Sequence, residues 1–153
     1  MNLIYKFLSA VLLLSTTALL SCEGEKDLIV IEGNLPIKTE TLYMVGDATP
    51  AGWNIDAPTA LTPTEDDPLV FVYEGNLNAG EFKCPLKPGN WGGVFVMPET
   101  NGCKISKSGI EDNSIALMPT GQPDNKWRVE DAGKYKLTFD LRNWSVVAVH
   151  VGE

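Results

Sequence analysis

The chain has 153 residues, with 12 basic and 20 acidic side chains and a formal net charge of −8. This acidic balance argues against nucleic acid or an anionic lipid surface as a partner, because both would repel the protein. The length suits one domain with a real core, and the charge suits a neutral ligand.

The first 21 residues predict a signal peptide that is removed on export. Lys6 provides a positive start, and residues 7–20 are apolar and uncharged but too short to form a stable membrane-spanning helix. The run ends in Leu19-Leu20-Ser21-Cys22, which resembles a bacterial lipobox. In such a sequence the chain is cleaved before the cysteine, and Cys22 then carries lipid. The alternative is a plain secretory signal with an incidental cysteine. Two or more acyl chains would anchor the mature protein stably to a membrane.

Residues 22–38 are predicted to form the lipidated N-terminus and a polar tether, and residues 39–153 the folded domain. Glu23, Glu25 and Asp27 follow the anchor closely. Acidic residues at this place resemble the export signals that send lipoproteins of Bacteroidetes to the cell surface. A solvated tether would also be charged, so both interpretations stay open.

The domain is expected to be all-β, because short apolar stretches are separated by Gly, Pro, Asn and Asp and none has a helical period. The clearest strand covers residues 134–141, where apolar and polar side chains alternate strictly. A turn at Arg142-Asn143 then predicts a hairpin with residues 146–151. The other expected strands are residues 41–45, 69–73, 80–84, 93–96, 105–108 and 126–129. This pattern predicts an immunoglobulin-like antiparallel β-sandwich, with a small closed barrel as the alternative.

Two cysteines remain after Cys22, and either of two arrangements fits them. Cys84 and Cys103 are able to form a disulfide in an oxidising compartment, or they are two buried thiols. With His150 they make no recognisable metal-ligand set, so no metal site is expected.

Sequence signals for catalysis are missing. The chain has no Gly-rich phosphate loop, no serine elbow and no His-rich metal motif, and His150 is predicted to occupy an exposed strand position. The acidic run Glu65-Asp66-Asp67 precedes Pro68 and is predicted to be a solvated turn rather than a pair of catalytic carboxylates. We therefore expect a protein that is not an enzyme and needs no cofactor.

The four tryptophans have different surroundings. Trp127 alternates with Val129 on an expected strand and is predicted to lie in the core, and Trp144 is predicted to pack over the end of the sandwich. Trp53 and Trp91 stand in loops of glycine, proline and asparagine, where a ring either plugs the core or forms an exposed platform.

An exposed indole platform covers the C–H face of a pyranose ring, and polar neighbours such as Lys83 and Asn90 are placed to bind its hydroxyls. Each ring would contribute about 2 kcal/mol by shielding apolar sugar surface. Two such rings predict dissociation constants of roughly micromolar to millimolar size.

The segment from Leu42 to Trp53, Leu-Tyr-Met-Val-Gly-Asp-Ala-Thr-Pro-Ala-Gly-Trp, resembles the opening of the starch-binding modules in the SusE/SusF outer-membrane lipoproteins. Residues 76–83, Trp91 and residues 127–141 match later parts of that module. Members of the family carry several modules, whereas this sequence holds one, and Cys84-Pro85 replaces a usual apolar strand residue.

The resemblance implies a surface lipoprotein of a polysaccharide-utilisation system that binds glycan without cleaving it. It implies aromatic platforms at Trp53 and Trp91, a basic hydrogen-bonding residue at Lys83, an α-glucan as the favoured ligand, and a SusC/SusD-type transport complex as a possible partner. The alternative is a structural or protein-interaction lipoprotein of the outer membrane, in which the loop tryptophans meet a protein.

Overall fold

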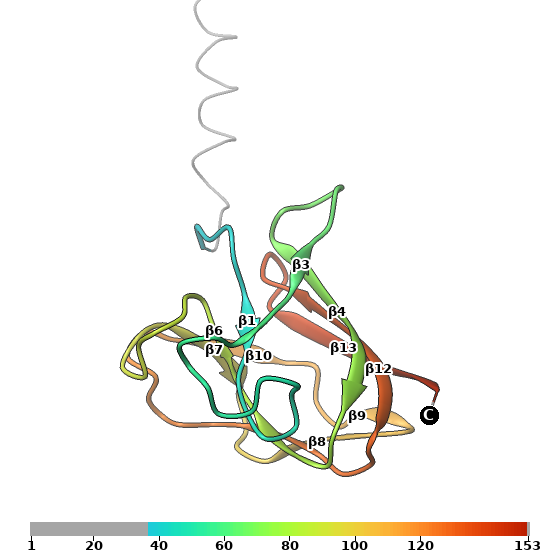
Figure 1. The fold of residues 1–153 in the computed structure, drawn as a ribbon. Helices are drawn as coiled ribbons and strands as arrows, with labels where there is room; N and C mark the ends of the chain where they lie inside the picture. Colours follow the sequence, from blue (N-terminus) through green and yellow to red (C-terminus); the bar gives the residue numbers. More distant parts are fainter. Residues whose placement is uncertain (1–36, 153) are drawn as a thin grey trace, which may run out of the picture. The chain divides into compact units, whose positions relative to one another are not determined.

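The computed structural model describes residues 37–152, and these form an all-β domain (Figure 1). The signal peptide, Cys22 and most of the tether lie outside the described residues. Within residues 37–152 no helix is found, as the sequence predicts, and hence none that could cross a membrane. The strands in chain order are β1 (Tyr43–Met44), β2 (Thr59–Ala60), β3 (Thr62–Pro63), β4 (Val70–Leu77), β5 (Gly80–Phe82), β6 (Cys84–Pro85), β7 (Phe95–Pro98), β8 (Cys103–Ser106), β9 (Gly109–Ile110), β10 (Ile115–Met118), β11 (Trp127–Val129), β12 (Gly133–Asp140) and β13 (Ser145–Gly152).

The strands assemble into two four-stranded sheets and two smaller ones. The first large sheet has the order β13-β12-β4-β3 and is antiparallel throughout, and Figure 1 shows its long strands side by side. The second has the order β5-β11-β8-β9, in which β11 pairs with β8 in parallel. A three-stranded sheet, β10-β7-β6, and the pair β1-β2 complete the domain. The parallel pair differs from the purely antiparallel sandwich that the sequence predicts.

Strand β12 confirms the predicted alternation. Tyr135, Leu137 and Phe139 are fully buried, and Leu141 just beyond the strand is buried as well, while Lys136 between them is exposed. The predicted hairpin with β13 also forms, with Phe139 opposite Val146. A polar–apolar alternation specifies which face of a strand enters the core, because successive side chains point to opposite faces.

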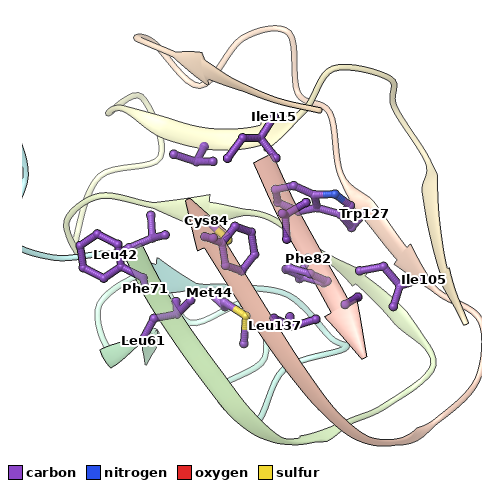
Figure 2. Close-up of a cluster of buried hydrophobic side chains, with 14 of the residues drawn as sticks. Leu42, Met44, Leu61, Phe71, Phe82, Cys84, Ile105, Ile115, Trp127 and Leu137 are labelled. Atoms are coloured by element: carbon purple, nitrogen blue, oxygen red, sulfur yellow. The ribbon is translucent and has the colours of Figure 1, made fainter. Parts of the chain in front are cut away.

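The main core cluster receives side chains from both large sheets and from the smaller ones. Trp127 of β11 is fully buried, stacks on Phe82 of β5 at a centroid distance of 5.1 Å, and meets the edge of Phe139 of β12 at 5.5 Å. Figure 2 shows Trp127 and Phe82 beside Leu137 of β12 in this cluster. Both layers therefore contribute aromatic rings to one interior, and the predicted core position of Trp127 is confirmed.

Three other predictions about single residues were tested by the structure. Trp144 is partly buried and packs against the core, as expected. His150 is half-buried with its ring edge-on to Tyr135 at 5.2 Å, so the prediction of an exposed position was wrong. Cys84 and Cys103 are both free and buried, so the disulfide alternative is not formed and the buried-thiol alternative describes the structure. Burial raises the pKa of both thiols, which keeps them protonated at neutral pH.

The predicted solvated acidic turn contains one side chain with a structural task. Asp67 binds Arg142 through two contacts, with Nε at 2.8 Å and an Nη at 3.0 Å, and its Oδ1 accepts the Leu69 N–H. The contact joins the turn before β4 to the β12–β13 turn. The Arg142 hydrogen bond, helped by the Leu69 N–H, lowers the pKa of Asp67 from 3.8 to about 2.

This ion pair predicts a loss of stability in acid. Because the folded-state pKa of Asp67 is depressed, its contribution is present above pH 3.8 and disappears as the pH falls towards 2. We expect Asp67→Asn to unfold at lower urea concentration than the parent near neutral pH, and the gap to close progressively in that acid window. The neighbouring exposed Asp66→Asn serves as the matched control and should give no such pH-dependent gap. A gap that stays constant down to pH 2 would contradict the assignment.

Candidate functional site

Two exposed tryptophans lie side by side on the domain. Trp53 is 41% exposed and Trp91 is 45% exposed, and they are among the few large apolar side chains of residues 37–152 that face solvent. Their ring centroids are 6.3 Å apart and the ring planes are inclined by 44°. An isolated surface indole is unremarkable, but two neighbouring ones form a continuous apolar patch that is typical of a binding surface.

Trp53 is carried by a tight turn between β1 and β2. The Gly46 N–H donates to the Gly52 carbonyl at 2.9 Å, and the Gly52 N–H donates to the Thr49 carbonyl at 3.1 Å. Thr49 is buried, and its hydroxyl donates to the Gly46 carbonyl at 2.8 Å. Gly52 has a φ of 63°, in the left-handed region that glycine adopts without strain. This turn projects the following side chain, Trp53, outward.

Trp91 is carried by the loop between β6 and β7. Asn90 closes a turn within it, because its Oδ1 accepts the Gly92 N–H at 2.9 Å and its carbonyl accepts the Gly93 N–H at 3.2 Å. The Gly89 N–H donates to the Ile55 carbonyl at 2.8 Å, which joins this loop directly to the Trp53 loop. Asn90 is exposed, but its amide oxygen holds the loop that presents Trp91.

Lys83 lies against the aromatic platform but is not at the surface. The residue is 6% exposed, and its Nζ is 5.3 Å from the Trp91 ring centroid and 4.6 Å from that of Phe95. Trp91 and Phe95 are nearly parallel, with an angle of 6° between their planes. The ammonium therefore makes cation–π contacts to both rings. This arrangement differs from the exposed sugar-binding lysine that the resemblance implies.

The buried charge of Lys83 is paired with Asp124. The Lys83 Nζ donates to Asp124 Oδ1 at 2.6 Å, and the Lys126 Nζ donates to Asp124 Oδ2 at 2.9 Å. Partial burial of Asp124 acts to raise its pKa, but the hydrogen bonds and charges of the two lysines outweigh this effect and lower it. Asp124 is thus held as a carboxylate by two cations, and its side chain stays 41% exposed.

The loop that carries Asp124, residues 119–126, touches the Trp91 loop. Gly121 has a φ of 70°, and a Cβ built on it would lie 2.8 Å from the Trp91 carbonyl oxygen. Only glycine fits this close approach without a shift of backbone. The candidate site is therefore built by three loops, which carry Trp53, Trp91 and Asp124.

Sequence reasoning found the two tryptophans and missed Asp124 and Phe95. Asp124 lies 41 positions from Lys83 along the chain. The only local signal was a charged turn, Asp124-Asn125-Lys126, before a core strand. Phe95 belongs to a run of buried residues in β7, so its spacing gave no hint that one ring face meets Lys83.

A separate hollow of about 340 Å³ contains two acidic side chains that bind backbone N–H groups. It is lined by Thr100, Asn101, Gly102, Cys103, Glu111 and Asp112. Glu111 Oε2 accepts the Lys104 N–H and Asp112 Oδ1 accepts the Ser114 N–H, so both carboxylates hold backbone. The Ser114 hydrogen bonds lower the pKa of Asp112, which favours its ionised form.

Comparisons with known proteins add no relative: no protein-family model matches the chain, and no curated protein or solved structure is significantly similar to it. Functional inference therefore starts from the residues and geometry described above.

Proposed function

We propose that this chain is a non-catalytic lipoprotein that binds a neutral glycan, with starch or malto-oligosaccharide favoured, at the Trp53–Trp91 surface. The observation that carries the proposal is the pair of exposed indole rings 6.3 Å apart. Each ring offers a flat apolar face to the C–H face of a pyranose, and two neighbouring rings offer two contacts along one oligosaccharide.

The loops that carry the rings support this proposal because they are held before any ligand arrives. Backbone hydrogen bonds close the Trp53 turn, Asn90 closes the Trp91 turn, and the Gly89–Ile55 bond joins the two. A surface that is already ordered loses little conformational freedom on binding, and that lowers the cost of association.

The proposal extends to the cellular setting that the sequence suggests. We place the protein at the outer membrane, anchored through lipid on Cys22 and facing the cell exterior, with an immunoglobulin-like sandwich as its glycan-binding domain. The acidic net charge of −8 suits a neutral polysaccharide. Weak single sites are adequate there, because many copies on one surface bind one polymer simultaneously. A SusC/SusD-type transport complex is the natural recipient of the captured glycan.

The proposal is tested by affinity electrophoresis and tryptophan fluorescence of the full-length chain, purified in a detergent without a sugar headgroup. We expect retardation in gels containing soluble starch, and a change in emission on titration with maltoheptaose that saturates between micromolar and millimolar concentration. Cellulose, mannan and xylan derivatives extend the panel. A chain that responds to no glycan, and instead co-purifies with a membrane protein, would favour the protein-interaction alternative.

A further inference from the structure

Asp124 has hydrogen-bonding capacity that its lysine partners do not use. A carboxylate has about four lone-pair sites on its two oxygens. Lys83 binds one oxygen and Lys126 binds the other, each through a single ammonium. Since the Asp124 side chain is 41% exposed, water or a ligand reaches the remaining sites. The two lysines fix the direction in which these sites point.

This carboxylate lies close to the aromatic platform. The Lys83 Nζ is 2.6 Å from Asp124 Oδ1 and 5.3 Å from the Trp91 ring centroid. Asp124 Oδ1 is therefore separated from the centre of the Trp91 ring by at most the sum of these two distances. That is within reach of the hydroxyl edge of a sugar whose face lies on Trp91. Lys83 itself is too buried to be that contact, because the residue is only 6% exposed.

We propose that Asp124 is the polar specificity residue of the Trp53–Trp91 site, and that it accepts hydrogen bonds from two adjacent hydroxyls of a neutral sugar stacked on Trp91. Lys83 is then a positioning residue, which binds the carboxylate and contacts the Trp91 ring. This inference rests on the proposed glycan binding and identifies the ligand class further, as sugars with a free pair of neighbouring hydroxyls. Hydrogen bonds to an ionised acceptor are stronger than neutral ones, so a single fixed carboxylate contributes strongly to discrimination.

A double-mutant cycle separates the two roles. Lys83→Met removes the buried ammonium but leaves Asp124 bound to Lys126, and Lys83→Met/Asp124→Ala then removes the carboxylate without leaving a buried charge unpaired. With maltoheptaose as the probe in titration calorimetry, we expect Lys83→Met to bind about threefold more weakly than the parent, because Lys126 alone then positions the carboxylate, and the double variant to bind at least about tenfold more weakly. Asp124→Ala alone should weaken binding as much as the double variant does, provided that thermal unfolding shows this variant to be folded.

The matched control is the exposed pair of Lys134 and Glu74, joined at 3.2 Å on the β12–β4 surface. Lys134→Met/Glu74→Ala should leave binding unchanged. The inference is overturned if Lys83→Met and Lys83→Met/Asp124→Ala bind equally well while Trp91→Ala does not bind. It is also overturned if Lys83→Met weakens binding as much as the double variant does, because the Lys83–Asp124 pair would then act only by holding Trp91. A parent chain that binds no glycan would overturn the proposed function as well.

Discussion

Trp91→Ala and Trp53→Ala are each expected to weaken the binding of maltoheptaose about 30-fold and to abolish retardation in starch gels. Burying one indole face against sugar contributes about 2 kcal/mol, and this corresponds to that factor in the dissociation constant. Both rings are partly exposed and adjacent, so each is able to contact a sugar, and each substitution removes one of the two contacts. Calorimetric titration and affinity gels measure the effect.

The control for this result removes exposed apolar surface elsewhere. Val149 is 49% exposed on β13, in a different sheet from the strands that flank the Trp91 loop. Val149→Ala should bind like the parent, and thermal unfolding should show that all three variants are folded, with some loss of stability in Trp91→Ala because its ring contacts Lys83 and Phe95. If both tryptophan variants were retarded like the parent, the glycan would bind elsewhere or not at all.

Trp127→Ala is expected to produce the largest loss of stability, about 3–5 kcal/mol in the free energy of unfolding. The ring is fully buried and contacts Phe82 in its own sheet and Phe139 in the opposite one. Its removal leaves a cavity between the two layers. For a domain with a total stability of about 5–15 kcal/mol, this loss brings the folded state close to its limit. Urea unfolding followed by circular dichroism measures it.

Two comparison variants sharpen the interpretation of that measurement. Trp127→Phe should lose less stability than Trp127→Ala, because it keeps an aromatic ring. It also removes the indole Nε1, which has no hydrogen-bond partner among the described residues. Arg128→Ala, at the exposed neighbouring position on β11, should stay within about 0.5 kcal/mol of the parent. Equal stability of Trp127→Ala and Arg128→Ala would contradict the described core.

The elements that the sequence predicted correctly are those whose signal is local. The alternation of β12 needs only eight consecutive residues, and the glycines beside Trp53 and Trp91 marked both as loop residues, of which the structure shows the exposed alternative. Strand β10 was missed, because Ile115–Met118 is apolar at every position and lacks a strand period. The parallel β8–β11 pair joins segments more than twenty residues apart, and no local pattern specifies such a pairing.

Lys83 shows why the polar half of the site was not predictable. In a regular strand it would alternate with Phe82 and Cys84 and face solvent, yet all three residues are buried. The core covers one side of this segment, and Trp91 and Phe95 cover the other. The charge is tolerated because Asp124, in a distant loop, accepts a hydrogen bond from the Lys83 ammonium. A single sequence contains no signal for that partnership.

The Gly89–Ile55 hydrogen bond has a consequence for how such a surface changes over evolutionary time. Because this bond between main-chain atoms joins the two loops, the spacing between positions 53 and 91 depends on backbone and not on which ring occupies them. If the surface binds glycan as proposed, exchange of either indole for a smaller aromatic ring would therefore weaken binding while the spacing of the two contacts stays the same. The affinity of the surface and the spacing of its two contacts can therefore change independently, so that one scaffold is able to bind ligands of one repeat length with different affinities.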